Sequence, residues 1–194
     1  MYLETERLVI NNLNLNDLQF LTDLDSDPVV RKFIDGKVKT IGETRQYLSE
    51  NIDGYLRHGF GLYAVRVKES LKPIGICGFL MENYGVDFGY RFSQSAWGQG
   101  IAKEAGNSVI RYGVDQLKLK KIVGIVLPDN IASEKVLISC GFTCVECDLW
   151  HANLRDANLT GADLMGAKLS GALMKGAILC NTTMPDGSVI YSGC

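Results

Sequence analysis

The sequence predicts an α/β fold of the α+β type, in which helices flank a mixed, mostly antiparallel sheet, followed by a short repetitive segment. Three apolar runs between residues 61 and 92 are separated by short turns, a pattern typical of an antiparallel meander. Segments with apolar residues at helical spacing lie on both sides of these runs. From Ala152 onwards an alanine and a leucine return together every five residues, so we divide the chain into residues 1–150 and 151–194.

Before the meander, the sequence first predicts one strand and two short helices. Residues 3–15, LETERLVINNLNL, alternate apolar and polar side chains, as a strand with one buried face does. Asn16 is suited to cap a helix over residues 17–24, because its side chain can accept from the free N–H groups of the first turn. Asp27 and Pro28 predict another helix start, since proline fits the first helical position.

A longer helix and the meander follow. Thr40 and Glu43 have the spacing of a capping box, in which each side chain bonds the backbone N–H of the other, and they predict a helix that runs to about residue 57. The expected strands of the meander are GLYAVRV (61–67), PIGICGFL (73–80) and VDFGYRF (86–92).

The rest of the first domain alternates helices and strands. Residues 101–117 carry apolar side chains at helical spacing, and the apolar run 121–127 predicts a buried strand. A helix over residues 131–140 is expected to stop at Gly141, and residues 142–150 are strand-like. We expect parallel pairing only around the long helix, because parallel strands need a crossover connection.

Composition and charge narrow the function classes. The net charge of −2 and the 22% of charged residues give no basic excess, so neither nucleic acid nor an anionic membrane is expected as a partner. No run of about 18 apolar residues predicts a membrane span. The first residues, MYLETERLVI, lack the pattern of a secretory signal, so the cytoplasm is the expected compartment.

The six cysteines are expected to be free thiols, because nothing in the sequence predicts export to an oxidising compartment. By residue type, Cys140, Cys144, Cys147 and His151 could supply four zinc ligands. Against this, TCVEC is rich in β-branched residues and strand-like, so its two thiols would splay apart instead of sharing a tight turn. We therefore favour small buried or strand-borne cysteines and predict no metal.

The most informative segment is YRFSQSAWGQGIAKEA, residues 90–105. A strand ends there, and Gly98 and Gly100 open a helix whose first N–H groups have no partner within the helix. These donors, together with the positive end of the helix dipole, suit an anionic phosphate. Two glycines alone are more often a tight strand-to-helix turn than a phosphate site. Lys103 replaces the third glycine of a dinucleotide-binding fingerprint, and no P-loop is present.

Several pieces agree in order and spacing with one family. LETERLVI, FGYRFSQSAWGQGIAKEA and LPDNIASEKVLISCGF, within residues 3–142, resemble a GNAT-type N-acetyltransferase of the ribosomal-protein N-terminal acetyltransferase-like subgroup. The resemblance implies a GNAT-like fold, acetyl-CoA as co-substrate and no metal. The family's acetyl-CoA motif, Gln/Arg-x-x-Gly-x-Gly/Ala, maps onto Trp97-Gly98-Gln99-Gly100-Ile101-Ala102.

The resemblance also implies how acetyl-CoA is held. Backbone N–H groups from Gly98 to Lys103 would bind the pyrophosphate, and the strand 90–92 would pair with the pantetheine amides like an added strand. Asn130 would hydrogen-bond the pantetheine, although a helix N-cap role is the alternative and both can hold. The implied cofactor-binding residues are Tyr90, Arg91, Phe92, Trp97, Gly98, Gln99, Gly100, Ile101, Ala102, Lys103 and Asn130.

Direct acetyl transfer needs a base for the amine, donors for the oxyanion and a partner for the departing thiolate, but no covalent enzyme intermediate. Many family members place a tyrosine where this chain has Leu137, so Ser133, which matches a serine of the subgroup, is the predicted partner of the sulfur. The alternative is an ordinary first-turn helix serine. Asp87 is the predicted base and Glu82 the other candidate, while surface carboxylates beside a turn are the plainer interpretation of both.

The repeat has a period that neither regular element explains. Five residues advance an α-helix by ~500°, so successive leucines would lie ~140° apart. In a strand they would alternate between faces. The segment resembles the pentapeptide-repeat family, a right-handed four-sided β-helix, and its seven repeats would make under two coils. So short a coil should stack on the sheet or on another copy. A disordered or helical tail is the alternative. The repeat also stands where the family's last strand should follow residues 142–150.

These observations favour an acetyl-CoA-dependent N-acetyltransferase that acts on a protein N-terminus or a small-molecule amine. The alternative is a catalytically weakened acetyl-CoA-binding or assembly module with the repeat as its interaction surface. A DNA-mimicking repeat is disfavoured because acids and bases balance. The expected partner is the amine substrate, with a homodimer through the repeat or the sheet edge. The charged residues of the tail are Asp156, Asp163 and Asp186 against Arg155, Lys168 and Lys175.

Overall fold

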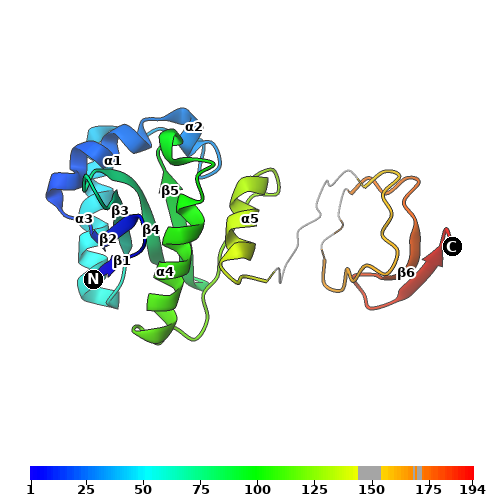
Figure 1. Cartoon of the computed structure of the whole chain (residues 1–194). Coiled ribbons are helices and arrows are strands. Elements are labelled where there is room, and N and C mark those ends of the chain that lie inside the picture. The colour runs from blue at the N-terminus through cyan, green and yellow to red at the C-terminus, as the bar shows by residue number, and fades with distance from the viewer. Residues whose placement is uncertain (144–153, 168, 170–171) are drawn as a thin grey trace. The chain divides into compact units, whose positions relative to one another are not determined.

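A computed structural model describes residues 1–143, 154–167, 169 and 172–194 (Figure 1). The chain divides into two compact units, Met1–Phe142 and Thr143–Cys194, and each is described by itself. Among the described helices, none is both long and apolar enough to cross a membrane.

The first unit is built on an antiparallel sheet whose strand order follows the chain from β1 to β5, which confirms the predicted meander. The strand expected over residues 3–15 is wrong in one respect: it is a hairpin of two strands. The chain turns at Thr5, whose N–H donates to the Leu8 carbonyl at 2.9 Å while its hydroxyl accepts from the Leu8 N–H at 3.0 Å. The strands are β1 (Tyr2–Glu4), β2 (Leu8–Asn12), β3 (Leu62–Val67), β4 (Pro73–Glu82) and β5 (Gly85–Phe92).

The helices begin where their capping residues predict, with one correction. Thr40 and Glu43 form the expected capping box. The first cap is Asn14 instead of Asn16, because Asp17 completes a capping box with Asn14 at the start of a 3-10 turn. The helical elements are η1 (Leu15–Asp17), α1 (Leu18–Asp25), α2 (Pro28–Arg31), α3 (Ile41–His58), η2 (Gln94–Ala96), α4 (Ile101–Asp115) and α5 (Ile131–Ser139).

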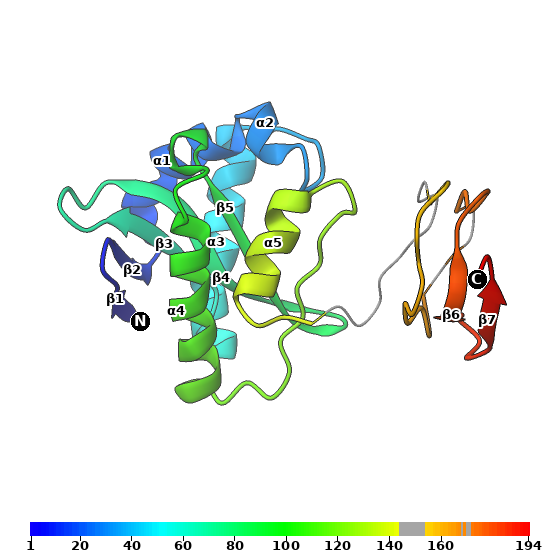
Figure 2. The same ribbon diagram turned by 45° about the vertical axis from the view of Figure 1, so that its right-hand side comes forward.

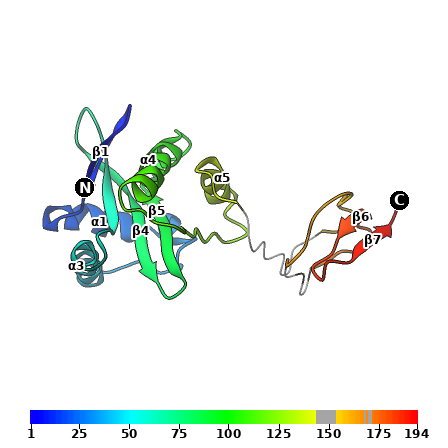
Figure 3. The same cartoon turned by 90° about the horizontal axis from the view of Figure 1, so that it is seen from below.

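Helices α4 and α3 lie on opposite faces of the sheet (Figure 3), and the sheet separates two apolar cores. On one face, Val109 of α4 packs in the same cluster as Phe79 and Phe88. On the other face, Leu48 of α3 packs with Leu62. Because successive residues of a strand point to opposite faces, β3 and β4 each contribute to both cores. Neighbours along β5 therefore reach different surroundings, which matters at the site.

The strand predicted over residues 121–127 does not form. Only Val123 pairs with β5, in parallel, through hydrogen bonds from the Phe88 N–H to its carbonyl at 2.7 Å and from its N–H to the Val86 carbonyl at 2.9 Å. In the described part of the chain, no strand pairs with the side of residues 121–127 that faces away from β5. Ile125 is therefore 65% exposed instead of buried. The expected strand 142–150, and with it the question of a missing last strand, falls mostly outside the described residues.

The second unit stacks its repeats (Figure 2). Asn158 pairs in parallel with Ile178, and Asp163 with Thr183, so neighbouring rungs lie 20 residues apart. This offset equals four repeats, as four pentapeptides per coil require. The right-handed sense of the coil stays a prediction.

Several of the described repeats make the same tight turn, which explains the period. The Ala162 N–H donates to the Leu159 carbonyl at 2.9 Å, and Gly161 between them has φ of +71°. Glycine adopts this left-handed conformation without steric cost. Thr182 takes the alanine position of its repeat, is fully buried, and donates from Oγ1 to the Leu159 carbonyl at 2.7 Å. Positive φ recurs at the same repeat position in Asp156, Gly161, Gly166, Gly176 and Asn181.

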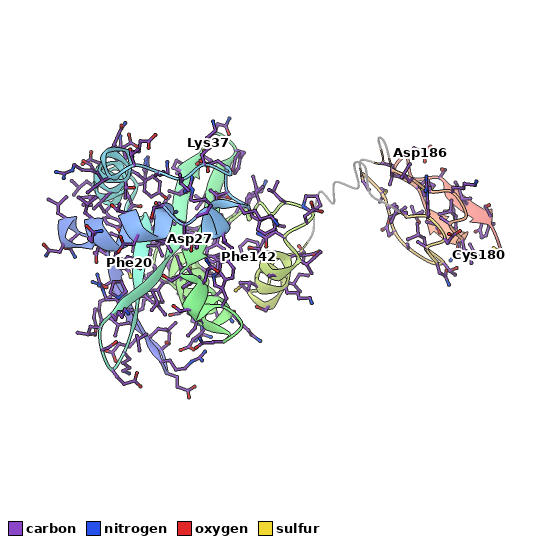
Figure 4. The ribbon with its side chains drawn as sticks, turned by 90° about the horizontal axis from the view of Figure 1, so that it is seen from above. Phe20, Asp27, Lys37, Phe142, Cys180 and Asp186 are labelled. Carbon is purple, nitrogen blue, oxygen red and sulfur yellow. A yellow bond between two sulfur atoms is a disulfide. The ribbon has the colours of Figure 1, made fainter. Side chains whose placement is uncertain are left out.

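The C-terminal hairpin corrects the expectation of free thiols. Strand β6 (Leu179–Thr183) pairs with β7 (Val189–Ser192), and a disulfide joins Cys180 to Cys194 (Figure 4). The two cysteines are 14 residues apart, so the bond closes the hairpin at its open end.

Two cysteines of the first unit, Cys77 and Cys140, are free and buried. Cys144, Cys147 and His151, the other members of the candidate zinc cluster, lie outside the described residues. Within the described residues no group of three metal-binding side chains occurs.

The close approach of two strands gives a first prediction. A Cβ on Gly78 would lie 2.3 Å from the Gly61 carbonyl oxygen, so Gly78→Ala should lower the free energy of unfolding by about 1–3 kcal/mol, because backbone cannot yield as a side chain can. Urea denaturation measures this. The matched control is Gly42→Ala in α3, where the nearest atom is 3.9 Å away, and the stability should stay the same or rise by up to about 1 kcal/mol. Equal effects of the two changes would contradict the prediction.

Candidate active site

A cavity of about 910 Å³ lies in the first unit between β5, the start of α4, residues 125–127 and α5. Its lining brings together almost every residue that the sequence predicts for the site. Gln99 is the exception. Its side-chain amide donates to the Ser95 backbone carbonyl at 2.6 Å, and its backbone carbonyl accepts from the Arg7 side chain at 3.0 Å. The predicted residues that line the cavity are Asp87, Tyr90, Arg91, Phe92, Trp97, Gly98, Gly100, Ile101, Ala102, Lys103, Asn130 and Ser133.

The loop before α4 is shaped by two glycines. Gly98 and Gly100 have φ of +71° and +74°, a conformation that residues with a Cβ rarely adopt. Intrahelical bonding starts at Glu104, whose N–H donates to the Gly100 carbonyl at 3.0 Å, so the preceding N–H groups of the helix remain available. The Glu104 carboxylate receives Arg7 Nη2 at 2.6 Å, which ties the start of α4 to the β1–β2 hairpin. The result is a rigid helix N-terminus facing the cavity, suited to an anion.

The outer edge of β5 is open beside this loop. Val86 and Phe88 use their outward carbonyl and N–H to bond Val123. Alternate residues of an antiparallel strand direct their backbone groups to the same side, so those of Tyr90 also point outward, beyond the point where residues 124–127 leave the sheet. The Phe92 carbonyl is already bonded by Trp97 Nε1 at 2.9 Å. Tyr90 therefore offers one N–H and one C=O to an extended ligand.

The Arg91 side chain points to the other face of the sheet and is engaged with a buried carboxylate. Asp25, at the end of α1, is fully buried; its Oδ1 lies 2.7 Å from Arg91 Nε, and its Oδ2 accepts from Arg91 Nη2 at 2.7 Å. Arg31 of α2 lies 3.3 Å from the same Oδ1. Tyr47 accepts from Arg91 Nη1 at 3.2 Å. Arg91 therefore offers no free polar group to a cofactor, because its side chain is paired with Asp25 and its backbone groups face Ile76 of β4.

Sequence reasoning missed this cluster. Asp25, Arg31 and Tyr47 belong to no motif, and Asp25 meets Arg91 across 66 positions of sequence. The arginine pair with a shared carboxylate fixes α2 against β5 at the side of the cavity where Phe33 and Ile34 contribute to the lining.

Asp87 is a half-buried carboxyl in the cavity lining, and its Oδ1 is buried with no hydrogen-bond partner. Burial raises the pKa of Asp87 above its ordinary value, and the neighbouring charge of Glu82 adds to the increase, while hydrogen bonds from Tyr84 and the Ile125 backbone oppose it. Glu82 is exposed and does not line the cavity. A carboxylate with a raised pKa and a free oxygen can accept a proton more readily than an ordinary surface one.

Asn130 and Ser133 stand at the start of α5. Asn130 is the N-cap, with its Oδ1 accepting from the Ser133 N–H at 3.2 Å, and it also lines the cavity. The capping alternative is thus confirmed for its oxygen, while its amide N–H groups are not needed for the cap. The Ser133 hydroxyl lies 2.6 Å from the hydroxyl of Tyr90.

An open strand edge, an anion-binding helix start and a polar cluster along one cavity together suit a long ligand with phosphates at one end and amides in the middle. This is the shape of an acyl-CoA, and the residues present fit it. Residues 7–143 match the model of the acetyltransferase (GNAT) domain, and residues 144–180 match that of pentapeptide repeats in eight copies. The chain belongs to the GNAT acetyltransferase family: it is an N-acetyltransferase, an acyltransferase that uses acetyl-CoA as co-substrate.

Relatives and solved structures agree with this assignment. The chain is 35% identical over 144 residues to an uncharacterized N-acetyltransferase p20 of Bacillus licheniformis, covering 72% of this chain and 81% of that protein. The fold is similar to that of a ribosomal-protein-S5-alanine acetyltransferase from Vibrio fischeri, with a TM-score of 0.66, 19% identity and coverage of 75% and 85%. It is also similar to a spermidine N-acetyltransferase from Vibrio cholerae in complex with CoA and spermine, with a TM-score of 0.62, 19% identity and coverage of 72% and 82%.

The Asp25 cluster gives a second prediction. Asp25→Ala would leave Arg91 buried without a carboxylate, so the free energy of unfolding should fall by about 3–5 kcal/mol, which urea denaturation measures. As a control, Glu4→Gln removes an exposed pair with Lys68 and should change little. A small effect of Asp25→Ala, similar to that of Glu4→Gln, would mean that the cluster does not hold α2 and β5 together.

Proposed function

We propose that this chain moves the acetyl group of acetyl-CoA directly to a primary amine, either the α-amine of a protein N-terminus or a small-molecule amine. The observation that carries the proposal is the placement of Asp87, with its unpartnered oxygen, in the same cavity as the open edge at Tyr90 and the hydroxyl of Ser133.

In this proposal the chain's own groups hold the donor in three places. The N–H groups from Gly98 to Lys103 bind the pyrophosphate at the start of α4. The Tyr90 N–H and C=O pair with the pantetheine arm as a neighbouring strand would. The amide N–H of Asn130 adds a hydrogen bond near the thioester end. Acetyl-CoA supplies the activated acyl group.

Asp87 acts as the base. An amine attacks only when neutral, and at pH 7 most primary amines are protonated, so a proton must be removed on the way to the amide. The raised pKa of Asp87 brings the carboxyl nearer to the working pH, which makes it a stronger base than an exposed aspartate. Its free oxygen can reach the amine directly or through one water.

The acceptor side of the cavity supports a single amine on an apolar group. Its lining includes Phe33, Tyr47 and Leu80. Asp35, which also lines it, pairs with Arg31 at 2.6 Å and is therefore neutralised. A polycation would call for several free carboxylates along the wall. The fold by itself does not choose, since its neighbours include enzymes named for a ribosomal-protein alanine and for spermidine.

The alternative, a weakened acetyl-CoA-binding or assembly module, is favoured by two observations. Leu137 stands where many family members have a tyrosine, so the hydroxyl of that tyrosine is missing here. The side chains of Ile125 and Leu127 are exposed at the cavity. A homodimer through the repeat or the sheet edge, and a cytoplasmic location, stay predictions. The Cys180–Cys194 bond speaks against the latter, because disulfides are rare in that compartment.

Release of CoA distinguishes enzyme from module. Acetyl-CoA is supplied to the full chain with a peptide bearing a free N-terminus, the same peptide with a blocked N-terminus, an amino acid ester, or spermidine. We expect turnover with the free peptide or the ester, little with spermidine and none with the blocked peptide. Binding of acetyl-CoA without turnover of any amine would establish the module instead.

The glycine loop gives a third prediction. Leucine at a left-handed position costs about 1–2 kcal/mol, so Gly100→Leu and Gly59→Leu should lower the melting temperature to a similar degree. Of these two glycines, Gly100 lines the cavity and Gly59 does not. Acetyl-CoA at 100 times its dissociation constant should therefore stabilise wild type and Gly59→Leu by about 2.7 kcal/mol but leave Gly100→Leu unchanged in a thermal shift assay. Retained stabilisation of Gly100→Leu would place the phosphate site elsewhere.

Asp87 gives a fourth prediction. Asp87→Asn should lower kcat by about 10²–10⁴-fold, because the base is lost. A carboxyl whose pKa is raised on folding destabilises the fold once it is charged, so stability falls as pH rises through the unfolded and then the folded pKa. Asp87→Asn should therefore melt higher than wild type at pH 7, with the difference vanishing below the unfolded pKa.

Glu82→Gln is the matched control. This carboxylate is exposed outside the cavity, so kcat should be retained. If Glu82→Gln loses activity and Asp87→Asn keeps it, the base has been assigned to the wrong carboxylate.

A further inference from the structure

Tyr90 and Ser133 come from different elements, β5 and α5, and meet at the cavity. The Tyr90 hydroxyl lies 2.6 Å from Ser133 Oγ and donates to the Ser133 backbone carbonyl at 3.0 Å. A phenol has one proton, so it donates at full strength to only one of these oxygens at a time. When it donates to the carbonyl, it accepts from the serine. When it turns to the serine oxygen, the serine proton is free for another acceptor.

The phenol stays a donor at every working pH. Burial raises the pKa of Tyr90 to about 12, partly opposed by the hydrogen bond with Ser133. The ionised form is therefore absent near neutrality, and Tyr90 neither repels an anion nor removes the serine proton.

No other hydroxyl on α5 replaces this pair within the cavity lining. Leu137, one turn after Ser133, lines the cavity with an apolar side chain and is only 7% exposed. The phenol that reaches this helix comes instead from Tyr90, across from β5. The backbone of Tyr90 faces the open edge at the same time, so main chain and side chain of one residue serve different parts of a bound CoA.

We propose that Tyr90 is a positioning residue for the leaving group: its phenol holds the Ser133 hydroxyl so that this hydroxyl donates a hydrogen bond to the CoA sulfur. As the C–N bond forms, the C–S bond breaks and its electron pair goes to the sulfur. The amine proton goes to Asp87. The sulfur departs as a thiolate, stabilised by Ser133, and takes a proton from water after release. This inference rests on the proposed function for the placement of CoA in the cavity.

The test uses CoA itself as the probe and needs no acceptor. The thiol of CoA bound to the full chain is titrated by the ultraviolet absorbance of its thiolate, with the protein alone subtracted because Cys77 and Cys140 also carry thiols. In wild type the bound thiol should have a lower pKa than free CoA. Tyr90→Phe and Ser133→Ala should each lower the thiolate-to-thiol ratio of bound CoA about tenfold, the effect of one lost hydrogen bond to an anion.

Two further variants make the result specific. The double variant Tyr90→Phe with Ser133→Ala should match Ser133→Ala alone, because Tyr90 acts through the serine. Tyr63→Phe removes a hydroxyl from another buried tyrosine, 1% exposed and outside the cavity lining, and should leave the thiol pKa as in wild type. Tyr90→Phe keeps the backbone of β5, so its affinity for CoA should be unchanged at a pH where the bound thiol is protonated.

Three results would overturn the inference: a bound thiol with the pKa of free CoA in wild type, no effect of Tyr90→Phe where Ser133→Ala has one, or a double variant that exceeds both. These leave the proposed function standing. If wild type does not bind CoA at all, the proposed function fails and this inference with it.

Discussion

The site depends on one constraint in the sheet: the outer edge of β5 pairs with the following chain at a single bridge. Val123 bonds Val86 and Phe88, and beyond it the chain leaves the sheet. The next outward groups of β5, the N–H and C=O of Tyr90, are then available to a ligand, and the space between the strand and the diverging chain is the cavity. Had residues 124–127 continued the pairing, the backbone of Tyr90 would be satisfied within the protein and an extended ligand would find no edge.

An open strand edge is useful only if it is held in place, and the buried Asp25 cluster does this from the opposite face. Arg91 follows Tyr90, so the residue that offers its backbone to a ligand is anchored through its neighbour to α1, α2 and α3. Burying three charged side chains costs desolvation free energy, but each has a partner of opposite charge. Removing one partner would leave a buried charge unpaired and destabilise the fold. The cluster thus joins the acceptor side of the cavity to the donor side.

The repeat obeys a different physical rule. Its period comes from a turn that needs a left-handed residue once in five, while the alanine and leucine positions are the less exposed ones. With few rungs to stack, the unit gains from closing its terminal hairpin with a disulfide, which restricts the unfolded chain. The two units therefore reach stability by separate means.

The sequence by itself determined what local rules fix: the meander, the capping box at Thr40, the start of α2 at Pro28, the glycine turn before α4 and the period of the repeat. These follow from backbone geometry and from hydrogen bonds between near neighbours. The sequence also predicted thirteen site residues from the family motifs, and twelve of them line one cavity.

Only the tertiary structure decided the rest. Whether residues 121–127 form a strand depends on a partner edge, not on their own apolar pattern, and here they pair only at Val123. The Arg91–Asp25 pair, the approach of Tyr90 to Ser133 and the Cys180–Cys194 bond join residues from different segments or from the two ends of a hairpin. No local pattern marks such contacts, because their energy arises from burial and pairing that exist only once the chain has folded.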